Sequence, residues 1–264
     1  MLIVGERINA TRKKIGEAVQ AQDAEHIKAE AIKQVEAGAN LIDVNGGIPG
    51  RETEFLLWLV DIVQGVVEVP LCLDSADADA LAAALPKCNQ PPMINSITFE
   101  QERLEKVTPL VKEHGAKVIA LCLSEDGPPK DFDGRIGIAG RLVDRLTGDG
   151  VPLENIYVDP CVFPISTSSD AGTFVLDAIS WIHAQYPGVH TICGASNVSF
   201  GLPVRKLLNA VFLAMLVGRG LDSAIIDPCN TLTRANLLAA EALIGRDDFC
   251  TSYIGAFRAG KLEV

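Results

Sequence analysis

The chain has 264 residues, of which 48% are hydrophobic, so it can bury a sizeable core and is not intrinsically disordered. Its net charge of −11 argues against nucleic acid or an anionic membrane surface as a partner. The opening apolar stretch MLIV is too short for a signal sequence, and no run approaches the ~20 apolar residues of a membrane span, which predicts a cytoplasmic protein.

Short apolar stretches typical of strands alternate with longer stretches typical of helices. The predicted strands are Leu2–Gly5, Leu41–Asn45, Leu71–Asp74, Met93–Asn95, Lys117–Leu121, Ile156–Asp159, Thr191–Gly194 and Ser223–Ile226. The predicted helices are Ala24–Ala37, Glu52–Val66, Ala78–Leu85, Glu102–His114, Gly134–Leu146, Ala171–Gln185, Pro203–Val217 and Leu232–Ile244. Eight strand–helix units indicate a single α/β domain over residues 1–264, folded as a (β/α)₈ TIM barrel.

Polar residues follow nearly every predicted strand, at the barrel end where catalytic residues of this fold lie. They are Glu6, Asn9, Asp43, Asn45, Asp74, Asn95, Asp159, Asn197, Asp227 and Asn230. All are carboxylates or amides, which donate and accept hydrogen bonds in pairs. Such a set fits a flat heterocycle with an amino group beside ring N–H and C=O groups.

Each of these residues also has a plain structural interpretation. Asp74 is followed by Ser75 and is as well suited to capping the next helix as to binding a ligand. Asp43 in IDVN is suited to bracing neighbouring loops, and Asp227 before Pro228 to forming a turn. The pattern as a whole is more specific than any single member.

No metal site is predicted. The seven cysteines form no CxxC or CxH pair, and the four histidines have the positions of helix-surface or helix-end residues. A metal-assisted lyase or aldolase that uses Asp43, Asp74 and Asp159 as ligands remains an alternative on the same fold.

The segment from Gly194 to Met215, GASNVSFGLPVRKLLNAVFLAM, carries the strongest local signal. Gly194 allows close backbone approach, Ser196 and Asn197 place a hydroxyl and an amide in the loop, and Arg205 lies in the first turn of the next helix. The apolar residues of that helix are predicted to pack on the sheet, namely Leu207, Leu208, Val211, Phe212 and Met215.

The segments IVGERIN, LIDVNGG, LCLDS, MINS, IYVDP and GASNVSFGLPVRKLLNAVFL resemble the methyltetrahydrofolate–corrinoid methyltransferases, which are similar to the folate-binding domain of cobalamin-dependent methionine synthase. The resemblance implies a pterin-binding barrel that moves the N5-methyl group between 5-methyltetrahydrofolate and the cobalt of a corrinoid. The corrinoid (cobalamin) would be supplied by a partner protein. It also implies a homodimer. Because the chain lacks a clustered Cys/His site, we expect catalysis to need no protein-bound metal.

The resemblance also implies roles for individual residues. Asp74, Asn95 and Asp159 would hydrogen-bond the pterin ring, and Asn197 would lie near N5. The remaining lining residues would be Glu6, Gly194, Ser196 and Arg205. The predicted catalytic residues are Asn197, whose carbonyl oxygen would accept a hydrogen bond from protonated N5, and Asp159, which would reinforce it.

Two other functions remain open. One is a dihydropteroate-synthase-like pterin enzyme, although the early loop of that family reads like NVTPDSF and this chain has RINATRKK. The other is a pterin-binding barrel without catalytic activity.

Overall fold

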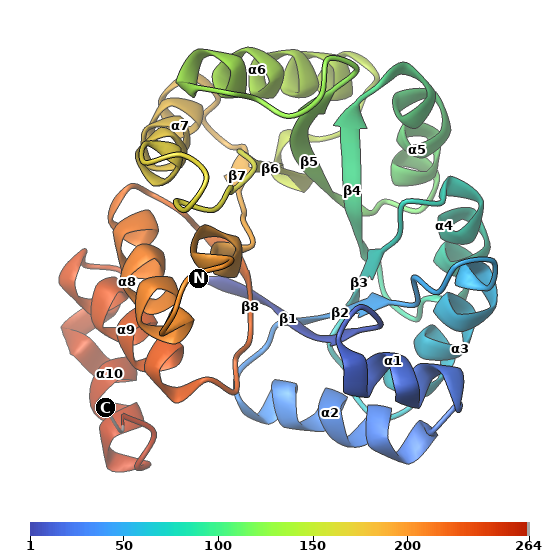
Figure 1. Ribbon diagram of the computed structural model, residues 1–264, viewed down its shortest axis with the longest axis horizontal. Coiled ribbons are helices and arrows are strands. Elements are labelled where there is room, and N and C mark those ends of the chain that lie inside the picture. The colour runs from blue at the N-terminus through green and yellow to red at the C-terminus, as the bar shows by residue number, and fades with distance from the viewer. Residues whose placement is uncertain (263–264) are drawn as a thin grey trace.

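The barrel predicted from the alternating pattern is present. The computed structural model describes residues 1–262, so the last two residues of the predicted domain, 263 and 264, lie outside the described residues. One parallel eight-stranded sheet has the order β7-β6-β5-β4-β3-β2-β1-β8. The ring closes between β7 and β8, where Gly194 bridges Ile225 and the Ile225 N–H donates to the Cys193 carbonyl at 3.0 Å. Helices surround the ring on all sides (Figure 1).

The eight strands lie where the apolar stretches predict them. They are β1 Leu2–Asn9, β2 Leu41–Asn45, β3 Leu71–Asp74, β4 Met93–Phe99, β5 Lys117–Ser124, β6 Ile156–Asp159, β7 His190–Thr191 and β8 Ser223–Ile226. β1, β4 and β5 are longer than predicted, because the strand pairing continues to Asn9 in β1, to Phe99 in β4 and to Ser124 in β5. β7 begins one residue earlier than predicted and ends at Thr191, and the residues up to Gly194 make only isolated pairings with β6 and β8.

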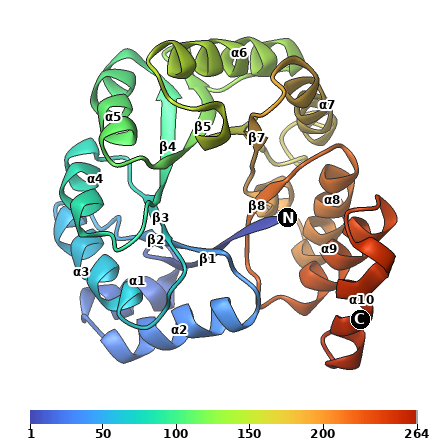
Figure 2. The same ribbon diagram turned by 180° about the vertical axis from the view of Figure 1, so that it is seen from behind.

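The eight predicted helices are present, with two more. They are α1 Lys13–Gln20, α2 Ala24–Glu36, α3 Glu52–Gln64, α4 Ala78–Ala84, α5 Gln101–Glu113, α6 Phe132–Gly148, α7 Ala171–Gln185, α8 Arg205–Gly218, α9 Thr231–Leu243 and α10 Thr251–Arg258. The sequence did not indicate α1 and α10, which have eight residues each. Viewed from behind, the helices still form one outer layer around the strands (Figure 2). No helix within residues 1–262 is long and apolar enough to span a membrane.

Glycine and aspartate define the ends of several helices. Gly38 and Gly115 have φ values of 98° and 57°, the left-handed conformation in which a chain leaves a helix and which glycine adopts without a Cβ clash. Asp23, Asp131 and Asn230 accept a backbone N–H at the start of α2, α6 and α9. These caps fix where each helix meets the following or preceding strand.

The inside of the barrel is a packed apolar core and not a channel. One side chain from each of seven strands or strand extensions fills it, namely Val4, Leu41, Cys72, Met93, Ile119, Tyr157 and Ile192. Alternate residues of the same strands face the helices. Because the interior is filled, a ligand has access only to the mouth, where the strand carboxyl ends meet.

The prediction that the apolar residues of α8 all pack on the sheet is wrong for three of them. Leu207, Val211 and Met215 are 53%, 47% and 50% exposed, whereas Phe212 is buried. The helix is apolar on two faces, since Leu213 and Val217 already fill the side toward the core. A period of 3.6 residues cannot distinguish two such faces from one broad face.

Candidate active site

All eight predicted site residues lie at the carboxyl ends of the strands. β1, β3, β4 and β6 carry Glu6, Asp74, Asn95 and Asp159, while Gly194, Ser196, Asn197 and Arg205 belong to the chain after β7. In a parallel barrel these ends face one side, so residues far apart in sequence come together. The structure therefore forms one polar mouth from the predicted set, on the inner circle of Figure 1.

One half of the mouth is a network of carboxylates and amides from four adjacent strands. Asn45 on β2 donates to an oxygen of Asp74 at 3.0 Å, and Asn9 on β1 lies 3.5 Å from the same oxygen. Asn95 on β4 donates to Asp43 on β2 at 3.2 Å. Both amides that approach Asp74 contact the same oxygen, so within residues 1–262 its other oxygen has no side-chain donor. That oxygen is available to the amino and N–H groups of a heterocycle.

Burial changes the ionisation of this network. Asp43 is 2% exposed, and burial raises the pKa of its carboxyl well above the usual range, with the charge of Asp74 adding to the effect. Burial also raises the pKa of Asp74, against the hydrogen bond from Asn45. Two acids at one site do not both ionise easily, so one of the pair can donate a hydrogen bond to a ligand while the other accepts one.

Asp159 lies across the mouth from this pair, at the end of β6. One of its oxygens accepts the backbone N–H of Cys161 at 2.8 Å. Burial raises the pKa of Asp159 to about 7, although the backbone N–H groups of Cys161 and Gly194 oppose the rise. The side chain therefore changes charge near neutral pH and is 8% exposed toward the mouth.

The loop after β7 carries the residues closest to the open side. Asn197 lies in a short 3₁₀ helix, Ala195–Ser199, and its side chain is exposed. A Cβ on Gly194 would lie 3.3 Å from the Asn197 amide nitrogen, so a glycine at this position avoids a close contact with the Asn197 side chain. Arg205 donates to the Ser196 carbonyl at 2.9 Å and to the Ser199 hydroxyl at 3.1 Å, which fixes the loop to α8.

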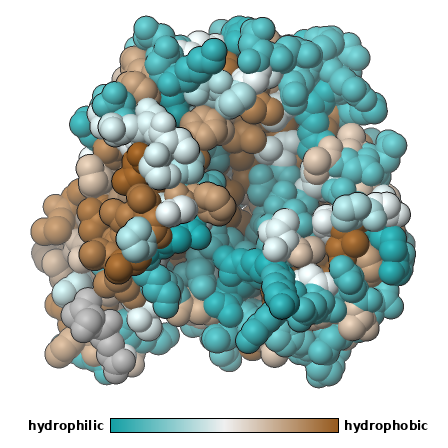
Figure 3. Space-filling view, in the orientation of Figure 1, coloured by the Kyte–Doolittle hydropathy of each residue, from teal (hydrophilic) through white to brown (hydrophobic). Residues whose placement is uncertain are grey.

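Ion pairs border the mouth between β1 and β8. Arg12 donates to Glu6 at 2.7 Å, and Arg7 donates to Asp227 at 2.9 Å. Burial raises the pKa of Glu6, while the charge of Arg12 opposes the rise. Glu6, Ser196 and Arg205 line a cavity of about 230 Å³ here. The space-filling view shows a hollow at the centre of this face, with hydrophilic side chains below it (Figure 3).

The structure decides between the two interpretations of several strand-end residues. The cap of α4 is Asp77, which accepts the Asp79 N–H at 2.9 Å, so Asp74 is free of that role. Asp227 does form a turn, since it accepts the Cys229 N–H at 3.0 Å. Asn230 caps α9.

Two contributors to the mouth were not assigned from the sequence. Asn45 was noted only as a strand-end amide, yet it holds Asp74 in place. Arg103 on α5 donates to the backbone carbonyls of Ser75, Ala76 and Ser96, which ties together the loops after β3 and β4. No pattern in the sequence signals this arginine, because its partners are backbone atoms of distant loops.

The described residues contain no group of three or more His, Cys, Asp or Glu side chains arranged to hold a metal ion. All seven cysteines are free thiols, with Cys72, Cys122 and Cys193 buried.

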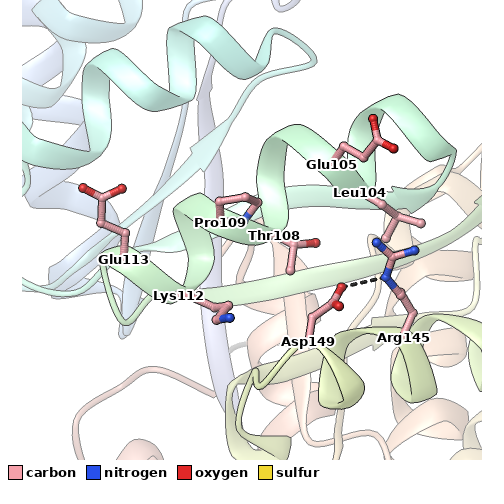
Figure 4. Close-up of a pocket in the computed structure, with 8 residues that line it drawn as sticks. All are labelled: Leu104, Glu105, Thr108, Pro109, Lys112, Glu113, Arg145 and Asp149. Atoms are coloured by element: carbon pink, nitrogen blue, oxygen red, sulfur yellow. Dashed lines mark hydrogen bonds and ion pairs between the residues drawn. The ribbon is translucent and has the colours of Figure 1, made fainter.

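A groove of about 550 Å³ lies away from the mouth, between α5 and α6. Lys112 and Glu113 border it together with the ion pair of Arg145 and Asp149 at 2.6 Å (Figure 4). None of the predicted site residues lines this groove, and its exposed ion pair contributes little binding energy.

Asp74→Asn tests whether the carboxylate network binds the ligand. In the pterin site that the sequence resemblance implies, the change would replace an acceptor oxygen by an amide that faces the donors of the ring, so we expect affinity for methyltetrahydrofolate to fall about tenfold or more. Asp77→Asn, at the cap of α4, is the matched control and should leave affinity unchanged. Calorimetric titration measures both. Parent affinity in a folded Asp74→Asn variant would remove Asp74 from the site.

Comparison with known proteins agrees with this geometry. A sequence family described as pterin binding enzyme matches residues 5–227. The chain is 35% identical over 265 residues to a methylcorrinoid:tetrahydrofolate methyltransferase of Eubacterium limosum, covering 99% of this chain and 98% of that protein. It is 34% identical over 240 residues to a methionine synthase of Mycobacterium tuberculosis, covering 86% of this chain and 20% of that protein.

Solved structures share the fold at low sequence identity. A dihydropteroate synthase of Xanthomonas albilineans in complex with 7,8-dihydropteroate superposes with a TM-score of 0.74 at 15% identity, covering 92% of this chain and 93% of that one. A dihydropteroate synthase of Coxiella burnetii in complex with pteroic acid gives 0.72 at 16% identity, covering 90% and 91%. At this identity the likeness establishes the barrel alone.

Proposed function

Because this chain belongs to the pterin binding enzyme family, we propose that it is a methyltransferase that moves the N5-methyl group between methyltetrahydrofolate and the cobalt of a corrinoid protein. The observation that carries the proposal is the polar mouth, in which carboxylates and amides from β2, β3, β4 and β6 converge on one opening. The methylcorrinoid:tetrahydrofolate methyltransferase of Eubacterium limosum, similar over its whole length, supports this chemistry over that of dihydropteroate synthase, which is similar in fold.

In the proposed complex the pterin ring lies flat in the mouth. Its amino edge faces Asp74 and Asn95, and its N–H groups reach the carboxylates of Asp74 and Asp159, which the hydrogen bonds from Asn45 and Cys161 orient. Each donor then finds an acceptor that is already oriented by protein hydrogen bonds. This preorganisation limits the cost of binding.

The difficult part of the reaction is charge at N5. A neutral tertiary amine is a poor leaving group, so N5 carries a proton when its methyl group departs as CH₃⁺, and the N–C bond electrons remain on N5. The corrinoid cobalt supplies the electron pair that forms the new bond to the methyl carbon. Asn197 is exposed at the open side, and its carbonyl oxygen accepts a hydrogen bond from the protonated N5.

Calorimetric titration with methyltetrahydrofolate tests the binding half of the proposal. We expect one site per chain and a rise in melting temperature at saturating ligand. Undetectable heat together with an unchanged melting temperature would contradict the proposal.

We propose further that the protein is a homodimer. The support is an apolar patch on one side of the molecule, seen in brown over α8, α9 and α10 in Figure 3. It includes the outer α8 residues Leu207, Val211 and Met215, and the side chains of Leu243 and Phe257, which are 87% and 71% exposed. Contiguous apolar patches mark interaction sites. Two copies of a chain with a net charge of −11 associate best through a surface without charge.

Val211→Glu tests the dimer. An unpaired carboxylate buried at an apolar interface costs several kcal/mol, so we expect the dissociation constant to rise about 100-fold or more and the variant to sediment as a monomer. Ile32→Glu, at a 39% exposed position on α2, is the control and should remain a dimer. A monomeric parent protein, or a dimeric Val211→Glu variant, would contradict this surface.

A further inference from the structure

A fully buried arginine lies behind the mouth. Arg135, in the first turn of α6, is 1% exposed, and no carboxylate within residues 1–262 forms an ion pair with it. Its guanidinium donates to the backbone carbonyls of Asp131 at 2.9 Å and Cys161 at 3.4 Å. Among residues 1–262, its buried Nε has no hydrogen-bond partner. The hydrogen bonds that the cation does make are thus to backbone carbonyls and not to an acid.

The surroundings of Arg135 join three elements. The guanidinium carbon lies 5.5 Å from the ring centre of Phe163, in the loop after β6, and 5.7 Å from that of Phe174 on α7. Stability alone does not require a cation here, because an apolar side chain of similar size often replaces a buried charge without loss. What the guanidinium adds is a donor aimed at the loop after β6.

Cys161 explains why that donor matters. Its φ is 65°, a left-handed conformation that is unfavourable for a residue with a Cβ and persists only when the surroundings hold it. The N–H of Cys161 donates to Asp159 at 2.8 Å, and its carbonyl accepts from Arg135 at 3.4 Å. The residue is therefore held from both sides, by the site carboxylate and by the buried guanidinium.

We propose that Arg135 is a positioning residue, which holds the Cys161 turn and thereby fixes the carboxylate of Asp159 toward the pterin. This rests on the proposed folate function. Arg135 does not touch the pterin, and its effect passes through the hydrogen bond from the Cys161 N–H to Asp159.

The chemistry around Asp159 makes the effect measurable. The groups that face Asp159 from neighbouring elements are the thiols of Cys122 on β5, Cys193 after β7 and Cys161 on its own loop, with Arg135 behind them. Burial raises the pKa of all three thiols, so none of them ionises near neutral pH. Asp43 and Asp74, whose pKa values burial also raises, lie on the other side of the mouth, so the pH dependence of folate binding that disappears in Asp159→Asn reports on Asp159.

The experiment measures methyltetrahydrofolate affinity between pH 5.5 and 8.5 for the parent, Arg135→Met, Arg135→Lys and Arg141→Met. Arg135→Met releases the turn and weakens the Cys161 N–H bond that favours ionised Asp159. The binding midpoint should therefore move up by roughly 0.5–1 pH unit, the effect of one weakened hydrogen bond. Arg135→Lys keeps a cationic donor and should lie between this variant and the parent. Arg141→Met, the same substitution on the exposed side of α6, should match the parent.

The outcomes separate the two proposals. A parent protein that binds no folate would overturn the proposed function itself. Parent binding with an unchanged midpoint in folded Arg135→Met would overturn the positioning role alone. If Arg135→Met does not fold, Arg135→Lys decides. A binding midpoint at a higher pH than that of the parent supports the role, and the same midpoint as the parent overturns it.

Discussion

Asn197→Ala is expected to lower kcat by about 10²–10³-fold while folate affinity changes much less. The neutral N5-methyl amine has no N–H, so the Asn197 carbonyl accepts a hydrogen bond only once N5 is protonated. The side chain therefore stabilises the protonated form, from which the methyl group leaves, more than the neutral bound folate. Within residues 1–262 the Asn197 amide forms no side-chain hydrogen bond, so its removal leaves no buried partner unsatisfied.

Measuring kcat, folate affinity and melting temperature on the same variant separates catalysis from structure. Asn89→Ala, at an exposed position before β4 and thus at the opposite end of the barrel, is the matched control. A purely structural Asn197 would lower the melting temperature, with the loss of activity following the unfolded fraction. Parent turnover in a variant that melts and binds normally would remove Asn197 from the mechanism.

Asp159→Asn is expected to weaken folate binding by about ten- to a hundredfold and to stabilise the free protein at alkaline pH. The carboxyl is buried with a pKa of about 7, above its value near 4 in an unfolded chain, so the folded state holds more protons than the unfolded state. Its contribution to stability is therefore lost as pH rises from about 4 to about 7. The neutral amide does not titrate and avoids this loss.

Two pH series check this prediction. Parent affinity for methyltetrahydrofolate should fall below about pH 7 and level off at about a ten- to hundredfold loss, because protonated Asp159 is a weaker acceptor for the pterin N–H, and the Asn variant should lack this step. The melting temperature of the variant relative to the parent should rise from pH 5 to pH 8. Parent-like affinity and pH dependence in the variant would assign Asp159 to the support of its own loop.

The strands that end in the site were predictable because an apolar stretch gives way to one polar residue. LIDVN, LCLD and IYVD end in the structure where that change occurs. The barrel topology then brings Asp74, Asn95 and Asp159 to one mouth, so their neighbourhood followed from the fold. β7 was harder, because only Thr191 of the predicted stretch TICG belongs to the regular strand, and the rest forms isolated pairings before the Asn197 loop.

Contacts that depend on side-chain reach were not predictable. Asn45 turns toward Asp74, and Arg103 turns toward the backbone after β3 and within β4. Both contacts depend on distances between strands, which the spacing of residues along the sequence does not encode. The outward face of α8 was missed because the helix is apolar toward the core and toward solvent. Periodicity identifies an apolar face but not what covers it.

Anaerobic mixing of the protein with methyltetrahydrofolate and free cob(I)alamin tests the proposed methyl transfer most directly. The absorbance of cob(I)alamin should disappear, and methylcobalamin and tetrahydrofolate should appear in equal amounts, at a rate proportional to protein concentration. The Asn197→Ala variant should slow this change by about 10²–10³-fold at saturating folate. The proposal would be contradicted by a protein that binds methyltetrahydrofolate at one site per chain but does not accelerate the loss of cob(I)alamin absorbance above its uncatalysed rate.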